Sequence, residues 1–470
     1  MLIRGAEVWG HGQADVRLVG ETIAALGGLE PLAGEPVIEA AGGALLPGLH
    51  DHHIHLAALA AARESVRCGP PEVRNPDDLA RTLSRSGEGW LRGVGYHESV
   101  AGMLEAAMLD RWVPDRPVRV QHRSGRMWFL NTLALDLLLE TEAAPAGLDR
   151  ATGRLFDEDR WLRRALGGRF PALGAVSAEL AASGVTGLSD MSPANDGGVA
   201  QSLAGELEAR RLVQDCVLAG TLALDQAPLP AGLALGPAKL HLHDAALPDP
   251  AAAVGFVAAA HAQGRPVAVH CTTEAELVFA LSAIAEAGPR QGDRIEHAGI
   301  APDHLVEEVA RLRLHVVTQP HFIAERGDRY LLEVEPADRP FLYRARAFLD
   351  AGVTLAAGSD APFGSADPWA AMRAAVSRQT AGGAFVGAEE ALTAEEALAL
   401  YFADPLDLAT ERRIAPGAAA DLCLLRLPWR QARSRLLADD VGLTLVKGRI
   451  VHQRIDQSPG QRGSGVDPPP

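Results

Sequence analysis

Histidines placed with an acidic residue after an apolar run are the feature of this sequence that most suggests chemistry. Residues 44–47 form such a run, and Asp51, His53 and His55 follow it. Side chains alternate between the two faces of a strand, so these three residues share one face. Two imidazoles at the end of one strand can bind the same metal ion. The segment therefore predicts part of a metal site.

Three more apolar runs end on residues of the same kind. His270 and His297 each close a short strand-like run, and Asp360 closes another. Strands that alternate with helical stretches are typical of βα units and a parallel sheet. In a closed (β/α)8 barrel the C-terminal ends of the strands meet around one active site. Four histidines and one aspartate delivered in this way would form a metal centre open to water and substrate.

The same pattern assigns eight barrel strands. Their predicted ends are His55, Asp190, Leu218, His243, His270, His297, Gln319 and Asp360. About 125 residues separate the first strand from the second, far more than an ordinary connection needs. We interpret residues 65–165 as an inserted subdomain that roofs the barrel mouth.

The ordered motifs resemble the metal-dependent amidohydrolase superfamily. They are Pro47-Gly48-x-x-Asp51-x-His53-x-His55, then His270, His297 and Gly358-Ser359-Asp360-Ala361-Pro362. Residues 319–322 (Gln-Pro-His-Phe), 367–369 (Asp-Pro-Trp) and 376–380 (Val-Ser-Arg-Gln-Thr) are similar to its amidohydrolase-3-like branch. The resemblance runs from about Ala6 to about Gln453.

The expected fold class is α/β, a (β/α)8 TIM barrel over residues 47–403 that includes the insertion after the first strand. Short alternating strands occur near both ends of the chain, and the resemblance implies that residues 1–46 and 404–455 pair into one composite β-sandwich domain. Residues 456–470 are rich in Gly, Ser, Gln and Pro and are expected to form a disordered tail.

The chemistry expected of this centre is metal-dependent hydrolysis of a non-peptide carbon–nitrogen bond, in an amide, N-acyl or carbamate-like small molecule. A Zn²⁺-type cation lowers the pKa of a bound water to about 7 and polarises a carbonyl. His53, His55 and either His270 or His297 would supply neutral nitrogen ligands. Asp360 would bind metal, take the proton from the attacking water and return it to the leaving nitrogen.

Lys239 decides how many metals the site would hold. The resemblance implies a carbamylated lysine on strand four that bridges two metals, and Lys239 stands at that position. The alternative is an ordinary barrel lysine paired with an acid. The expected cofactor is a divalent metal at one or two ions per chain, and Zn²⁺ is the metal we expect.

Four residues are predicted to contact the substrate. Arg126 suits a carboxylate because a guanidinium forms bidentate hydrogen bonds, and the other three lie near expected loop or strand ends: His122, His243 and Arg378. For each arginine the alternative is a surface residue on a loop. For His243 the alternative is a polar strand end bonded to loops.

Two other functions remain open. One is a mononuclear deaminase of a heterocycle, in which a glutamate follows the strand-five histidine by three residues. Here Glu274 follows His270 by four, and an acid that begins a helix is the competing interpretation. The other is a non-catalytic assembly protein on the same fold, which usually lacks metal ligands, whereas this chain has them all.

Composition and charge limit the classes of partner and the cellular location that we expect for this protein. The net charge is −16 with a pI near 5.5, and no basic block occurs, which argues against nucleic acid. The four scattered cysteines favour the reducing cytoplasm. No signal-peptide pattern is present, and no apolar run reaches the ~18 residues of a membrane span. A small-molecule substrate is the expected partner. The sequence leaves open whether copies of the chain associate into a homo-oligomer.

Overall fold

The computed structural model describes residues 1–470 except 71, 85–86, 88, 168–169, 226–227 and 455–470. Contacts divide the chain into two compact units, one of Met1–His55 with Ser177–Pro470 and one of Leu56–Val176. The second unit contains the predicted insertion, 65–165. The domain boundaries stay predictions, and the predicted tail, 456–470, lies outside the described residues.

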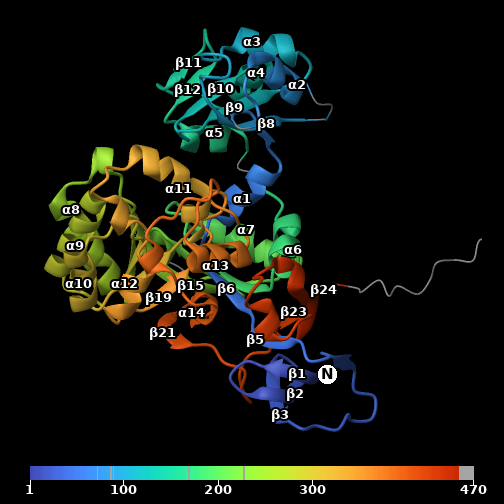
Figure 1. Cartoon of the computed structure of the whole chain (residues 1–470). Coiled ribbons are helices and arrows are strands. Elements are labelled where there is room, and N and C mark those ends of the chain that lie inside the picture. The colour runs from blue at the N-terminus through green and yellow to red at the C-terminus, as the bar shows by residue number, and fades with distance from the viewer. Residues whose placement is uncertain (71, 85–86, 88, 168–169, 226–227, 455–470) are drawn as a thin grey trace, which may run out of the picture. The chain divides into compact units, whose positions relative to one another are not determined.

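Eight parallel strands in the first unit confirm the predicted barrel (Figure 1). Two hydrogen bonds connect the last strand to the first: the Asp360 amide donates to the His53 carbonyl at 2.6 Å, and the His55 amide donates to the Ala361 carbonyl at 2.9 Å. The strands, in order, are β6 (Leu49–Ile54), β13 (Val185–Asp190), β14 (Asp215–Gly220), β15 (Leu233–His241), β16 (Val267–Cys271), β17 (Arg294–His297), β18 (His315–Thr318) and β19 (Leu355–Ala357).

Strand β15 ends at His241, two residues before the predicted end at His243. It runs through Gly236 and Pro237, residues that normally interrupt a central strand. The register between β14 and β15 shifts between Leu218 and Gly220, beside this pair, which accommodates a residue that lacks an amide hydrogen. The pairing with β16 begins at Ala238, so Lys239 stands in register beside Ala268.

The helices of this unit begin where the sequence supplies caps. Asp196, Asp249, Thr273 and Thr393 accept hydrogen bonds from the first-turn amides of α7, α8, α9 and α14. The helices are α6 (Gly174–Ala182), which spans the division between the units, α7 (Gly197–Glu208), α8 (Pro250–Ala262), α9 (Glu274–Ala287), α10 (Asp303–Arg311), α11 (His321–Glu333), α12 (Ala345–Asp350), α13 (Pro368–Ser377), α14 (Ala394–Ala399) and α15 (Trp429–Ala432). No helix in the described part of the chain is both long and apolar enough for a bilayer crossing.

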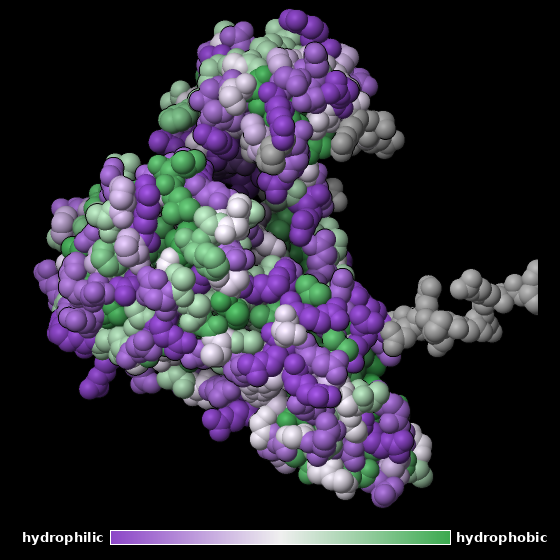
Figure 2. All heavy atoms as spheres, viewed as in Figure 1, coloured by the Kyte–Doolittle hydropathy of each residue, from purple (hydrophilic) through white to green (hydrophobic). Residues whose placement is uncertain are grey.

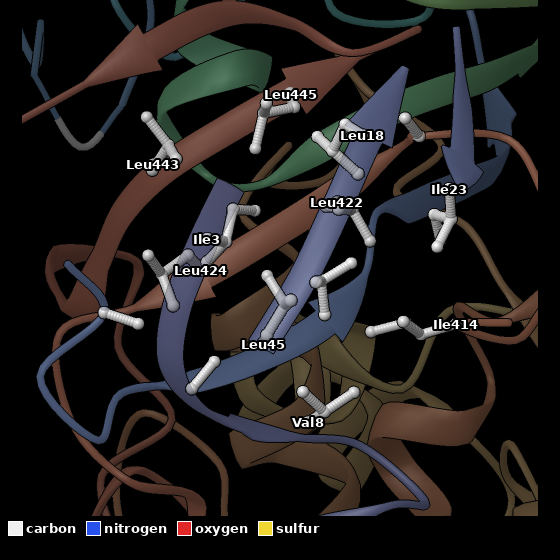
Figure 3. Close-up of a cluster of buried hydrophobic side chains, with 14 residues drawn as sticks. Ile3, Val8, Leu18, Ile23, Leu45, Ile414, Leu422, Leu424, Leu443 and Leu445 are labelled. Atoms are coloured by element: carbon white, nitrogen blue, oxygen red, sulfur yellow. The ribbon is translucent and has the colours of Figure 1, made fainter. Parts of the chain in front are cut away.

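A separate sheet joins the two ends of the chain. Its central contact is the pairing of β5 with the parallel β1 on one side and the antiparallel β22 on the other. Side chains from early and late strands, including Ile3, Leu45, Leu422 and Leu445, pack into one apolar cluster (Figure 3). The strands are β1 (Leu2–Val8), β2 (Gly12–Val19), β3 (Thr22–Gly27), β4 (Val37–Glu39), β5 (Ala44–Pro47), β22 (Leu422–Leu425), β23 (Val441–Val446) and β24 (Arg449–Gln453), and the nearby β20 (Ala403–Asp404) and β21 (Asp407–Glu411) form a small ladder of their own.

The second unit has a sheet of six short strands with its own core. One face buries Leu91, Val118, Val120 and Phe129, which is the alternation expected of a half-buried sheet. Hydrophilic residues cover much of the face of this unit that Figure 2 shows. Its elements are α1 (Leu56–Arg63), β7 (Val66–Arg67), α2 (Pro76–Leu83), β8 (Leu91–Tyr96), α3 (Ala106–Trp112), β9 (Val118–His122), β10 (Met127–Leu130), α4 (Thr132–Thr141), β11 (Leu148–Asp149), β12 (Arg154–Phe156) and α5 (Asp159–Ala165).

Candidate metal centre

His53 is held at the end of β6 by a carboxylate from β17. Its Nδ1 lies 2.5 Å from Oε2 of Glu296, and both side chains are fully buried. Glu296 is itself held by Arg294, whose Nε donates to Oε1 at 2.6 Å. Because Nδ1 is engaged, Nε2 is the nitrogen left for another partner, and it lies 3.4 Å from Oδ1 of Asp360. A carboxylate behind a histidine is the usual way to orient a metal ligand.

His55 faces the same aspartate from the residue after β6. Its Nε2 lies 3.0 Å from Oδ1 of Asp360, and its Nδ1 lies 3.1 Å from the hydroxyl of Ser192. One ligand atom from each of His53, His55 and Asp360 lies within 4.8 Å of the others. The structure therefore gathers three of the predicted metal residues into one cluster.

The backbone around Asp360 is shaped for this contact. Asp360 has a φ of 51° and His297 a φ of 72°, values that residues other than glycine seldom adopt. Such strain concentrates at functional sites, where the surrounding structure enforces it. Gly358 is required for a related reason, because a Cβ there would lie 2.4 Å from the His53 amide nitrogen.

His297, His270 and Lys239 border this cluster. The His297 ring lies 4.8 Å from that of His53 and 4.5 Å from that of His270, between ring centroids. Nδ1 of His297 pairs with Oε1 of Gln319 at 2.7 Å. Nε2 of His297 and Nζ of Lys239 are buried and have no hydrogen-bond partner in the described part of the chain. Buried polar atoms without partners are rare, and a bound ion is one explanation for them.

The electrostatics favour neutral ligands beside an ionised acid. Burial lowers the pKa values of His53, His270 and His297, so their imidazoles are neutral at pH 7 and can coordinate metal. Burial alone would raise the pKa of Asp360, but the hydrogen bond with His55 and the nearby imidazoles hold it below its usual value. Burial also lowers the pKa of Lys239. The donor set thus fits a divalent cation.

Two residues near the cluster were not predicted as parts of it. Glu296 and Arg294 act behind the ligands, and the sequence signal for them is an alternating charged pair inside an otherwise apolar strand, Arg294-Ile295-Glu296-His297. Asp51 shares the expected strand with His53, but its carboxylate accepts the amides of His53 at 3.1 Å and Ser359 at 2.9 Å. Burial raises the pKa of Asp51 to about 6. Asp51 thus fixes the loop after β19 to β6.

The predicted substrate residues of the first unit have different environments. His243 is exposed and stands at the N-cap position of the short helix at Asp244–Ala246, next to the end of β15, where its side chain makes no capping hydrogen bond. Arg378 is buried, an environment that does not favour substrate contact, and its substrate role stays a prediction. Its side chain is 1% exposed, and its guanidinium donates to the carbonyls of Leu342, Tyr343, Val386 and Gly387. An arginine that is bonded to four backbone carbonyls and enclosed in this way has no exposed donor to offer a substrate.

The other two predicted residues lie in the second unit. Arg126 is exposed, pairs with Asp157 through two hydrogen bonds and stacks on Phe156. His122 binds Glu98 through Nε2 at 2.8 Å and the Ser124 hydroxyl through Nδ1 at 2.8 Å. Contact of either residue with substrate stays a prediction.

Glu274 stands at the start of a helix, as the interpretation of this residue as a helix-initiating acid requires. It is the first residue of α9, directly after the N-cap Thr273, whose capping box is completed by Glu276. A carboxylate in the first turn of a helix is favourable because the helix N-terminus is positive. The position therefore has a structural explanation that needs no role in proton transfer.

Comparison with known proteins decides the family. The model of the amidohydrolase family, in its amidohydrolase-3 branch, matches residues 36–452. This chain belongs to the amidohydrolase family. The predicted resemblance is confirmed, and the amidohydrolase is a metal-dependent hydrolase of carbon–nitrogen bonds.

Individual relatives of this amidohydrolase agree over nearly the full length. It is 26% identical to an N-substituted formamide deformylase from Arthrobacter pascens over 89% of this chain and 90% of that protein. It is 23% identical to the putative amidohydrolase YtcJ from Bacillus subtilis (strain 168), over 88% and 90%. Its fold matches an uncharacterized metal-dependent hydrolase from Pyrococcus horikoshii OT3 with a TM-score of 0.76 at 19% identity, covering 91% of this chain and 97% of that one.

Proposed function

We propose that this amidohydrolase cleaves the carbon–nitrogen bond of small amides, N-acyl compounds or carbamates and releases an acid and an amine. The observation that carries the proposal is the cluster of His53, His55 and Asp360, in which each histidine is held through Nδ1 and presents Nε2. His270 and His297 are the further ligands we propose. We favour Zn²⁺ because the donor set is rich in nitrogen.

The bound cation would supply a water of lowered pKa and a polarised substrate carbonyl. Asp360 is proposed to accept the proton of the attacking water on a carboxylate oxygen, and then to donate that proton to the leaving nitrogen. The water oxygen ends in the acid product, and the nitrogen leaves as the amine. Glu296 and Gln319 keep His53 and His297 in the orientation that presents Nε2.

Lys239 is proposed to carry a carbamate and to bridge a second metal. The neutral amine would add CO₂ and lose one proton, which converts it into an anionic ligand. Burial, which lowers the pKa of Lys239, favours the neutral amine that this addition needs. The chain contains only one other lysine, the partly exposed Lys447, which pairs with Asp215.

Those two lysines make a matched test. We expect elemental analysis of protein purified without chelators to give two metals per chain, falling to one or none in Lys239→Ala and unchanged in Lys447→Ala. Protein equilibrated with ¹³CO₂ should show one slowly exchanging carbamate carbon signal that Lys239→Ala removes. One metal per chain, unchanged in Lys239→Ala, would contradict the bridge.

The substrate class is tested by product analysis. A relative named as an N-substituted formamide deformylase makes N-alkyl and N-aryl formamides the first compounds to assay, followed by N-acyl amino acids and carbamates. We expect equal amounts of acid and amine. Release of ammonia from a heterocycle without an acid product would instead support the deaminase.

The four cysteines are buried and free, which supports the proposal of a reducing, cytoplasmic location.

A further inference from the structure

Two arginines share one face of the sheet in the second unit. Arg92 on β8 and Arg119 on β9 are partners in register on neighbouring parallel strands. They lie on the face opposite to the apolar side chains of Leu91, Val118 and Val120, and both are half-buried. Two guanidinium groups held side by side are of like charge, and neither can lose its proton near pH 7. Such an arrangement normally has anions to balance it.

Aromatic rings hold these guanidiniums in place. The Cζ atoms of Arg92 and Arg119 lie 5.5 Å and 5.6 Å from the centroid of the Trp128 ring, and Arg119 also lies 5.8 Å from that of Trp90. Guanidinium groups stack on aromatic faces in this range. Stacking fixes the plane of a guanidinium while leaving its edge of N–H donors for another partner.

The donors are not used up by the protein. Arg92 donates to the Ser65 hydroxyl at 2.9 Å and weakly to Oε1 of Gln121 at 3.5 Å. The side chain of Arg119 has no hydrogen-bond or ion-pair partner among the described residues, and its Nε is enclosed without one. Burying a donor without a partner is costly, so the site is incomplete as it stands.

The nearby acids do not neutralise the pair. Asp159 and Glu64 are near enough to influence Arg92, but neither forms an ion pair with it in the described structure, and Asp159 accepts from Nε1 of Trp128 at 2.9 Å. The group whose charge acts on Arg119 is Arg92 itself. Burial and that like charge lower the pKa of Arg119 to about 10, which still leaves it protonated at pH 7.

We propose that Arg92 and Arg119 form a binding site for a small oxyanion, a carboxylate or a phosphate group, on the Trp90 and Trp128 platform. The terminal nitrogens of Arg119 would donate to the anion, and Arg92 would complete its coordination. This site is distinct from the metal chemistry proposed for the barrel. Its guanidiniums are less exposed than that of Arg126, which pairs with Asp157, and we therefore favour them over Arg126 as carboxylate ligands of this unit.

The test is calorimetric titration of the metal-loaded full-length protein at low ionic strength. The probes are inorganic phosphate and benzoate, the second of which adds a planar ring for Trp128. We expect Arg119→Gln to weaken binding of the preferred probe at least tenfold, and Arg119→Lys to weaken it less. The exposed Arg81, which pairs with Asp78, gives the matched control Arg81→Gln, expected to stay within twofold of the wild type.

A metal can also bind these anions, so the variant His55→Asn separates the two sites. Binding that survives His55→Asn and is lost in Arg119→Gln supports the proposal, and the preferred probe then names the ligand as phosphate or carboxylate. Binding that is lost in His55→Asn and kept in Arg119→Gln would overturn it, as would no binding of either probe to the wild type. A circular dichroism spectrum and a melting curve establish that Arg119→Gln is folded.

Discussion

The barrel end and the sheet of the second unit bury ionisable groups in opposite ways. At the barrel end the buried bases are imidazoles, which lose their charge on burial and so become donors of electron pairs to a cation. On the sheet of the second unit the buried bases are guanidiniums, which keep their charge and are stabilised by stacking on tryptophan. The difference teaches that the choice between His and Arg decides whether a buried basic cluster attracts a cation or an anion.

The largest expected effect breaks the cation-binding half of this comparison. Asp360→Asn removes the proposed proton acceptor and a charged ligand, so kcat should fall by about 10³-fold or more, which corresponds to roughly 4 kcal/mol of transition-state stabilisation. Steady-state kinetics on a hydrolysed formamide or amide measures it. Asp350→Asn, an exposed acid on α12, is the matched control and should be within twofold of the wild type. Full activity in Asp360→Asn would refute the assignment.

The second-largest expected effect concerns Arg378, a buried arginine of the first unit that takes part in neither the proposed cation site nor the proposed anion site. Arg378→Met leaves several buried carbonyls without donors and should lower the free energy of unfolding by about 3 kcal/mol. Denaturant unfolding measures this, and KM of the remaining folded enzyme should not change. A raised KM with unchanged stability would restore the substrate role that the sequence suggested.

A smaller effect sharpens how the barrel histidines are held. Glu296→Gln keeps the shape of the side chain but replaces the carboxylate behind His53 with a neutral amide. We expect metal affinity to fall about 10- to 100-fold, because the partner of a ligating histidine sets its orientation and basicity. Competition with a fluorescent chelator measures the affinity. Glu333→Gln, in an exposed pair with Arg329 on α11, provides the control and should leave it unchanged.

The smallest expected effect concerns the ion pair of Glu396 with Arg346, which lies outside both proposed sites. The hydrogen bond from Arg346 lowers the pKa of Glu396 to about 2, from an ordinary value of 4.5. Its ionised form therefore stabilises the folded state above pH 4.5, and this contribution is lost as the pH falls from 4.5 towards 2. Melting temperatures should show Glu396→Gln slightly less stable at pH 7, with the difference shrinking below pH 4.5. A difference that grows in acid would contradict this sign.

The sequence predicted the barrel because its strands carry their chemistry at their ends. His53, His55, His270, His297 and Asp360 each close a run of apolar residues, and topology then fixes where those ends go. Glu296 was not recognised because its role depends on which strand lies across the barrel from β17. The burial of Arg378 was not foreseen because a motif next to strand eight does not reveal whether a side chain turns inwards.

The second unit was harder for a physical reason. Its charged residues lie on the face of a sheet rather than at strand ends, so their neighbours depend on strand register. Arg92 and Arg119 are 27 positions apart in the sequence and become neighbours only through the pairing of β8 with β9. Arg126 could be named from its residue type, but its partner, Asp157, is contributed by the segment after β12.

The junction between β6 and β19 also constrains how the protein matures. His53 and His55 are synthesised early, whereas Asp360 and the segment that bonds to them are synthesised only after the other six barrel strands. A nascent chain therefore carries both imidazoles without Asp360 until the last barrel strand has been synthesised. Tight metal binding therefore has to follow closure of the barrel. The metal content of the purified protein then measures the fraction of molecules that have completed folding.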